Sequence, residues 1–421
     1  MVIMCSSVSI ADESPAFDGM TVLEVYGAGM TAYQQEDYTG FYDAMSELDI
    51  RRPYQLPVQY NFAIAHILIG DLDGAVARLD YVADLGLSID LPADSDFDPL
   101  KDHPGYQALQ ARFTSNAAPF GESELAFEFD SLDVLPEGLA IDERDGTIFI
   151  STVRSGEIYR FRMDGELEVF ADGDVHEGMG GIFGMAVDAA RGVLWATSST
   201  PALYRGANHG AETGSHLYAF DLSTGEVRHA FEISGEGAFL GEVLVAPSGD
   251  VYASDSMVPR LFRFSDGMSE PEEISLEGTT TNLQGFDFAP DGRIYLADYQ
   301  AGLFVLNRDG TDIVKLMMPE SVNPSGIDGM FYREGALIGI QNATQPHRIV
   351  RYELSSDGNA ISDFEVLVSN HDLWDEPTLG QIVDGRLFYI ATAEWPDYGA
   401  DGERHEGSEM HPIRIMSVDL D

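Results

Sequence analysis

A unit of short alternating strands recurs six times in the later part of the chain, and this repeat constrains the fold more than any other feature. In its first copy, Glu137-Gly138 opens an apolar run, and Asp145-Gly146 leads through a hairpin turn into a second run. The corresponding positions are 138, 184, 242, 285, 329 and 380, with steps of 46, 58, 43, 44 and 51 residues. A repeat of about 40–50 residues holding four short strands is typical of a propeller blade. The sequence therefore predicts an all-β six-bladed propeller, with an insertion at residues 200–214 that explains the long second step.

The two ends of the repeat region are expected to complete one blade between them. The sixth copy stops at its third strand, residues 413–418. The missing fourth strand stands before the first copy, at residues 125–129, within a closing strand placed at 122–130. Pairing of these two segments closes the ring and leaves no open sheet edge. The predicted propeller domain therefore covers residues 117–421.

Residues 21–116 have the apolar spacing of helices rather than of strands. Pro57 stands where a helix start tolerates proline, and Gly70 and Gly86 stand where helices end. The stretch 60–75 resembles a tetratricopeptide unit, with a small residue in mid-helix and Gly-Asp at the turn. We predict a small all-α tetratricopeptide-like domain at 21–116, of about two helix pairs, through which a protein partner could bind.

Residues 1–20 are expected to be either disordered or the remnant of a targeting segment. The first eleven residues are mildly apolar and contain no Lys or Arg, and they are too short for a complete signal peptide. A periplasmic or secreted location is the prediction, and a cytoplasmic location is the alternative.

The charge of the chain excludes several classes of partner. There are 72 Asp and Glu residues against 23 Lys and Arg, a formal net charge of −49, and only Lys101 and Lys315 are lysines. Nucleic acids and anionic membrane surfaces both require clustered basic residues. No apolar run approaches the roughly 20 residues of a membrane span. The acidity is not a sign of disorder, because hydrophobic residues make up 44% of the chain. Cys5 is the only cysteine, so a disulfide framework and a cysteine-based zinc site are excluded.

The repeat also predicts which residues meet at the channel. Innermost strands of a propeller begin around one mouth of the central channel, so the residues beside the repeated glycine should converge there. These residues are Glu137, Phe183, Gly241 with Glu242, Gln284, Asp328, and Leu379 with Glu376 just upstream. Oxygen-bearing side chains without cysteine suit calcium or magnesium, and less often zinc or manganese. About one residue in six is acidic, so chance is the competing explanation. We predict a divalent metal, calcium first, held by Glu137, Glu242, Gln284 and Asp328.

Residues 122–421 resemble the senescence-marker-protein/gluconolactonase superfamily of six-bladed propellers, which is related to paraoxonases and strictosidine-synthase-like proteins. Glu137-Gly138 matches the family's Glu-Gly pair, whose Glu binds the metal. Asp328-Gly329-Met330 matches its Asp-Gly-Met, whose Asp is both ligand and base. The family's Asn-Gly corresponds here to Gln284-Gly285, in which the amide oxygen lies one methylene further out. The family's substrate-binding Asn-Asp-Gly is absent, and Gly241-Glu242 stands in its place.

The resemblance implies metal-dependent opening of a lactone or ester. In that chemistry the cation polarises the carbonyl and lowers the pKa of a bound water. Asp328 would then take the proton from the attacking water.

Further side chains follow strands that end near the same face, and they are candidates for substrate contact. They are Asn342, Arg348, His347, Asp298, Asp255 and Glu376. For Asp255 and Asp298 the alternative is capping of a turn within the blade. For His347 the alternatives are a catalytic base and an ordinary surface histidine.

Two functions of different classes therefore remain. The first is a metal-dependent hydrolase of the gluconolactonase-like type, which the convergent carboxylates favour. The second is a non-catalytic binding or scaffold propeller, which Gln284 and the missing substrate asparagine favour.

Overall fold

The computed structural model describes residues 15–163, 165–172, 178–206, 214–235, 237–265, 267, 270–308 and 310–421. The chain divides into two compact units, one ending at Ala117 and the other beginning at Ala118. Part of the sequence prediction lies outside the described residues, namely most of the 1–20 segment and positions 207–213 of the insertion in the second repeat.

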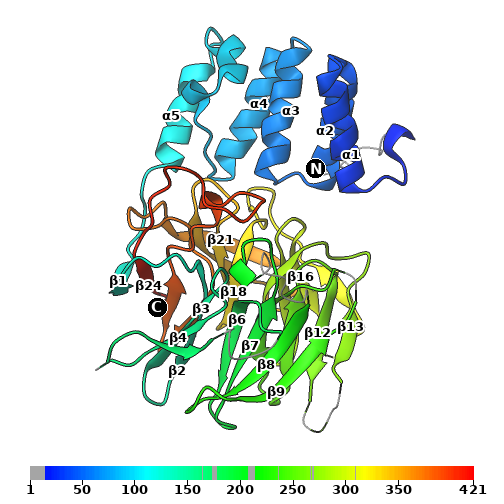
Figure 1. Cartoon of the computed structure of the whole chain (residues 1–421). Helices are drawn as coiled ribbons and strands as arrows, with labels where there is room; N and C mark the ends of the chain where they lie inside the picture. Colours follow the sequence, from blue (N-terminus) through cyan, green and yellow to red (C-terminus); the bar gives the residue numbers. More distant parts are fainter. Residues whose placement is uncertain are drawn as a thin grey trace. The chain divides into compact units, whose positions relative to one another are not determined.

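In the described residues of the first unit, 15–117, the regular secondary structure is helical (Figure 1). Its α-helices are α1 (Val22–Gln34), α2 (Tyr38–Arg51), α3 (Leu56–Leu68), α4 (Leu72–Asp84) and α5 (Tyr106–Asn116). Short 3₁₀ turns are η1 (Pro15–Phe17), η2 (Leu91–Ala93) and η3 (Ser95–Leu100). Helix α1 packs on α2, and α3 packs on α4. The predicted two helix pairs are therefore present, with α5 in addition, and their likeness to tetratricopeptide units stays a prediction.

Local sequence signals explain where these helices begin and end. Thr21 and Glu24 form a reciprocal capping box at the start of α1. Asp71 caps α4 by accepting a hydrogen bond from the amide of Gly74. Gly70 lies beyond the end of α3 with a φ of 84°, a backbone conformation that glycine adopts without strain. Across the described residues, no helix has the length and apolar character needed to cross a membrane.

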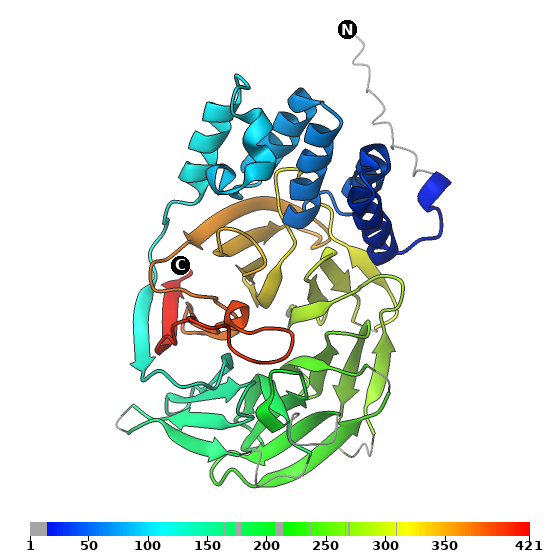
Figure 2. The same ribbon diagram turned by 45° about the horizontal axis from the view of Figure 1, so that its top comes forward.

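The second unit consists of six four-stranded antiparallel sheets, which surround a central axis (Figure 2). Blade one contains β2 (Pro136–Asp142), β3 (Thr147–Thr152), β4 (Ile158–Phe161) and β5 (Glu168–Ala171). Blade two contains β6 (Gly181–Asp188), β7 (Val193–Ser199), β8 (Ser215–Asp221) and β9 (Val227–Ile233). Blade three contains β10 (Leu240–Val245), β11 (Val251–Asp255), β12 (Arg260–Phe264) and β13 (Glu272–Ser275).

The later blades repeat the same order of strands. Blade four contains β14 (Leu283–Phe288), β15 (Ile294–Asp298), β16 (Gly302–Leu306) and β17 (Ile313–Lys315). Blade five contains β18 (Ile327–Arg333), β19 (Ala336–Gln341), β20 (Arg348–Leu354) and β21 (Ile361–Ser369). Blade six contains β22 (Gly380–Val383), β23 (Arg386–Ile390), β24 (Ile413–Asp419) and, as its outermost strand, β1 (Glu124–Phe129).

The six-bladed propeller preceded by helices is thus confirmed, and so is the way in which the ring closes. Strand β1 pairs antiparallel with β24, with Phe129 opposite Ile413 and Leu125 opposite Met416. A strand from the beginning of the unit therefore completes the blade made by its end. This pairing covers the sheet edge that β24 would otherwise expose.

The repeated glycine exists because neighbouring innermost strands approach very closely. Strand β14 packs against β18 of the next blade. A Cβ atom on Gly285 would lie 2.5 Å from the amide nitrogen of Met330 and 2.6 Å from the carbonyl oxygen of Asp328. Gly138 of blade one is similar, since its Cβ would lie 2.3 Å from the carbonyl oxygen of Phe183 in blade two. No side chain fits at such distances from main-chain atoms. Glycine is therefore required at these positions by the packing of one blade on the next.

We expect Gly285→Ala to destabilise the propeller by about 2–3 kcal/mol, because the added methyl group forces two blades apart. For a unit of this size the melting temperature should fall by ~5–10 °C, measured by differential scanning calorimetry. Gly27→Ala in α1 is the matched control, because a Cβ there meets nothing within 4 Å. A Gly285→Ala protein that melts within a degree of the wild type would contradict this account of the repeat.

Candidate active site

One cavity of about 350 Å³ receives a side chain or backbone from all six blades. The six residues directly before the repeated position, one from each blade, all lie on its wall: Glu137, Phe183, Gly241, Gln284, Asp328 and Leu379. They are widely separated in sequence and meet because each lies at or near the start of its blade's innermost strand. The volume is typical of a pocket for a small molecule.

The rest of the wall comes from loops and strand ends. The additional lining residues are Phe239, Glu242, Ser256, Met257, Asn282, Tyr299, Asn342, Glu376 and Trp395. Three of them, Ser256, Tyr299 and Asn342, directly follow the second strand of their blade. Polar and acidic groups thus share the wall with a set of aromatic and aliphatic side chains.

The four carboxyl groups of this wall all have raised pKa values. Burial raises the pKa of Glu242 to about 8 and that of Asp328 to about 6. Burial, with the nearby Asp328, raises the pKa of Glu376 to about 8. For Glu137 burial and then Asp328 push the pKa well above its usual value, against a hydrogen bond from Trp395 that lowers it. Four acids so placed repel one another when ionised, and a bound cation would relieve that repulsion.

Two of these carboxylates are held by well-defined donors. The indole Nε1 of Trp395 donates to Glu137 Oε2 at 2.7 Å. The Nδ2 of Asn342 donates to Asp328 Oδ2 at 2.7 Å. Asn342 is itself oriented, because the hydroxyl of Tyr299 donates to its Oδ1 at 2.7 Å. These two hydrogen bonds, from Tyr299 to Asn342 and from Asn342 to Asp328, orient the Asp328 carboxylate on the cavity wall.

The other polar groups have mainly local partners. The amide of Val243 donates to Glu242 Oε1 at 3.0 Å. The amide of Trp395 donates to Glu376 Oε2 at 3.1 Å. Gln284 donates from its Nε2 to the Oδ1 of Asn282 at 2.8 Å.

The donor set fits a hard cation in its chemistry, because carboxylate and amide oxygens are what calcium and magnesium prefer. Its arrangement is open rather than cage-like. Over the described part of the chain, no three His, Cys, Asp or Glu side chains come close enough together to hold a metal by themselves. A cation at this wall would therefore take at most two carboxylates and complete its shell with amide oxygens and water.

No family model matches the chain, and no curated protein sequence does. Solved structures of similar fold include a gluconolactonase from Xanthomonas campestris, 16% identical over 71% of this chain and 91% of its own, with a TM-score of 0.47. A PQQ-bound aldose sugar dehydrogenase from Streptomyces coelicolor is 14% identical over 72% of this chain and 100% of its own, with a TM-score of 0.47. A virginiamycin B lyase from Staphylococcus aureus is 11% identical over 71% of this chain and 100% of its own, again with a TM-score of 0.47. The likeness is one of fold, shared by proteins whose names describe different chemistries.

Six of the residues singled out in the sequence lie together on the cavity wall: Glu137, Glu242, Gln284, Asp328, Asn342 and Glu376. Asp255 and Asp298 were candidates for substrate contact, but the structure places them elsewhere. Asp255 is fully buried, accepts from the amides of Met257 and Val258, and pairs with Arg260 at 3.0 Å. Asp298 is also fully buried and accepts from the amides of Gln300 and Ala301 at 2.9 and 2.6 Å. Both therefore cap turns, which was the alternative interpretation.

Arg348 and His347 also lie away from the cavity wall. Arg348 opens β20 directly opposite Gln341 and donates to its Oε1 at 2.8 Å, inside blade five. Burial lowers the Arg348 pKa to about 10. His347 is partly buried, and burial lowers its pKa, so it is not an ordinary surface histidine.

The sequence prediction missed Tyr299 and Ser256 by a single position. Successive residues of an extended strand point to opposite sides, so the residue after Asp298 reaches the cavity while Asp298 itself turns into the blade. Asn342 stands at the same place in blade five and could have indicated the correct phase. Trp395 and Phe239 lie outside the repeat pattern, and no signal in the sequence points to them.

Proposed function

We propose that this protein is a metal-dependent hydrolase of the gluconolactonase-like type, which opens a lactone or ester at the cavity of the propeller. The observation that carries the proposal is the gathering of Glu137, Glu242, Asp328 and Glu376 on one wall. Among the described lining residues there is no Lys, Arg or His to balance them. Buried carboxylates without a basic partner are costly unless a cation accompanies them.

Glu137 and Asp328 are the proposed carboxylate ligands, because Asp328 is the charge that acts most strongly on Glu137. Gln284 would add an amide oxygen from a neighbouring blade, and Glu242 would act through a water bound to the cation. Calcium is the cation that we expect first. Such a cation, when bound, polarises the carbonyl group of the substrate.

Asp328 is the proposed general base for the attacking water. Its pKa of about 6 leaves it ionised at neutral pH and still basic enough to accept a proton. Asn342 holds one oxygen of the carboxylate and Tyr299 holds Asn342, so the other oxygen keeps a constant direction. The aromatic and aliphatic part of the wall would shield the reaction from bulk water.

The proposal is tested first by cation binding. Protein stripped with EDTA and titrated with calcium in a calorimeter should show a bound ion and a rise in melting temperature. We expect Glu137→Gln to weaken calcium affinity by at least ~10-fold, because a ligand charge is lost. Glu232→Gln, at an exposed position on β9, is the control and should bind calcium like the wild type.

Activity decides between the two classes of function. A panel of δ-valerolactone, glucono-δ-lactone and aryl acetates should show calcium-dependent turnover of at least one member. If calcium, magnesium, zinc and manganese all fail to bind or stabilise the protein, and no member of the panel is hydrolysed, the hydrolase proposal is wrong. The propeller would then be a binding or scaffold domain.

A further inference from the structure

The connection between β23 and β24, residues 391–412, forms part of the cavity wall. It contains the 3₁₀ turn η5 (Trp395–Asp397) and, with 22 residues, it is longer than the corresponding connection of blade two, which has 15 residues at 200–214. The residue before η5, Glu394, is buried and has a φ of 65°. A left-handed backbone at a non-glycine residue is sparsely populated and persists only where surrounding contacts hold it.

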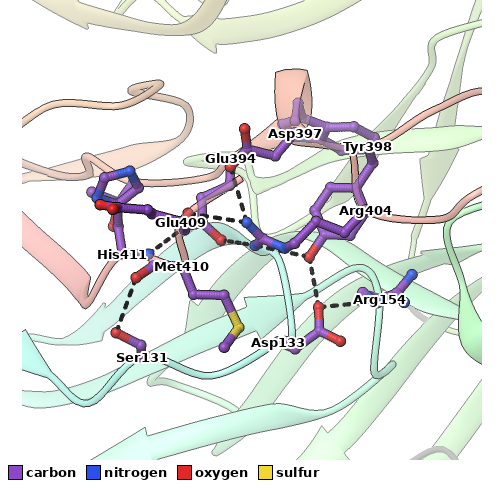
Figure 3. Close-up of polar contacts among 12 residues, drawn as sticks. Ser131, Asp133, Arg154, Glu394, Asp397, Tyr398, Arg404, Glu409, Met410 and His411 are labelled. Atoms are coloured by element: carbon purple, nitrogen blue, oxygen red, sulfur yellow. Dashed lines mark hydrogen bonds and ion pairs between the residues drawn. The ribbon is translucent and has the colours of Figure 1, made fainter. Parts of the chain in front are cut away.

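Arg404 makes several of the contacts that hold this segment together (Figure 3). Its guanidinium pairs with Glu394, and with Asp397 at 3.0 Å. It also donates to the hydroxyl of Tyr398 and to the carbonyl of Glu409, both at 3.1 Å. One partly buried arginine therefore joins both limbs of the segment around η5.

The segment is also attached to blade one (Figure 3). The hydroxyl of Tyr398 donates to Asp133 Oδ1 at 2.7 Å, and Arg154 pairs with the same oxygen at 3.0 Å. Arg154 also donates to the carbonyl of Gly402 at 2.6 Å. A segment held at both limbs and to a neighbouring blade is a fixed wall rather than a mobile lid.

This fixed wall brings Trp395 to the site. The Trp395 ring stacks on Phe183, with centroids 6.3 Å apart and planes at 27°. Phe183 meets Phe239 edge to face, with centroids 5.0 Å apart. The indole nitrogen meanwhile donates to Glu137, so one side chain serves both the apolar wall and the acidic wall.

The two walls together restrict the charge of a ligand. The wall carries four carboxyl groups, and no basic side chain is found among the described lining residues. A divalent cation would offset two negative charges, but no fixed positive group remains for an anionic substituent. A flat apolar group, in contrast, would find the faces of Trp395 and Phe183.

We propose that the cavity selects uncharged lactones or esters that carry a flat apolar ring, that Trp395 is the wall on which this ring packs, and that anionic substrates are rejected. Trp395 is also a positioning residue for Glu137. This inference rests on the proposed hydrolase function, and it names the substrate class of that same site.

The test uses two aryl esters of nearly the same shape that differ in charge, 4-acetoxybenzamide and 4-acetoxybenzoate, with calcium present. For the wild type we expect kcat/KM to favour the neutral ester by at least tenfold. Trp395→Ala should raise KM for the neutral ester at least tenfold. Trp395→Phe should keep KM within about threefold and lower kcat, because the ring remains while the hydrogen bond to Glu137 is lost.

Two further variants make the test specific. Trp374→Phe is the matched control, because the Trp374 indole donates to the Tyr389 hydroxyl at 3.0 Å in blade six and does not line the cavity. Its KM and charge preference should equal those of the wild type. Met257→Lys adds a positive charge at an exposed position of the wall, where Met257 is 63% exposed. It should improve the relative kcat/KM of the anionic ester at least fivefold.

A binding experiment separates this inference from the hydrolase proposal. The ketones 4-acetylbenzamide and 4-acetylbenzoate, which contain no ester bond, are titrated into the wild type and Trp395→Ala by calorimetry. If no ester is hydrolysed but the neutral ketone binds through Trp395 and the anion does not, the hydrolase proposal fails and the selectivity stands. Equal binding of both ketones, binding of neither, or an unchanged affinity in Trp395→Ala overturns the selectivity.

Discussion

Asp328→Asn is expected to lower kcat for lactone or ester hydrolysis by ~10²–10⁴-fold, the usual loss when a general base is removed. The substitution keeps the size of the side chain and removes its ability to accept a proton. Asn342, which donates to Asp328 Oδ2, can still hydrogen-bond to an amide oxygen. The fold should therefore survive, and circular dichroism with stopped-flow kinetics would separate lost chemistry from lost structure.

Asp287 on β14 supplies the matched control for this experiment. It is another acid whose pKa burial raises, to about 6, but its Oδ2 accepts from the amide of Tyr332 at 2.7 Å and it does not line the cavity. Asp287→Asn should leave kcat within about threefold of the wild type. If Asp328→Asn keeps wild-type turnover, or if both variants lose it equally, Asp328 is not the base.

The metal-free protein should become less stable as the pH rises from 5 to 8. Glu376 in the folded protein keeps its proton to a pH of about 8, whereas in the unfolded chain it loses it near 4.5. Between these values the folded state binds more protons, so the free energy of unfolding falls as the pH rises. At about 1.4 kcal/mol per pH unit, Glu376 alone accounts for up to roughly 5 kcal/mol. The melting temperature in EDTA should fall by ~10 °C across this range.

Two comparisons attribute that loss to the cavity. Glu376→Gln carries no titrating group and should remove a large part of the decline, whereas the exposed Glu232→Gln should not. Saturating calcium should abolish most of the decline, because the cation offsets the ionised carboxylates. A melting temperature that is constant or rises between pH 5 and 8 in EDTA would show that burial does not raise the pKa values of these carboxyl groups.

The blade count and the ring closure could be predicted because both leave periodic traces in the sequence. A glycine such as Gly285 lies where one blade's backbone approaches the next to within van der Waals contact, and glycine recurs at five of the six repeat positions. The pairing of β1 with β24 could also be predicted, because the sixth repeat lacks its fourth strand and an additional strand precedes the first repeat. Local patterns of this kind survive in the chain because packing enforces them.

The candidate site was only partly predictable, because repeat phase determines position but not side-chain direction. Glu137, Gln284 and Asp328 occupy equivalent places and reach one wall. Asp298 was chosen in place of its neighbour Tyr299, since a shift of one residue in an extended strand reverses the side of the sheet. The acidic composition made such errors easy, because suitable carboxylates are present almost everywhere.

The sequence by itself determined the architecture and the ring of residues that meets at the cavity, because both follow from a repeat that can be counted along the chain. Only the tertiary structure decided what closes that cavity. Trp395 lies in a long connection without any repeat, and Glu394, Arg404 and Tyr398 hold it through contacts that reach another blade. Contacts between residues so far apart leave no periodic pattern, so the part of the wall that Trp395 forms beside the carboxylates became visible only in the folded molecule.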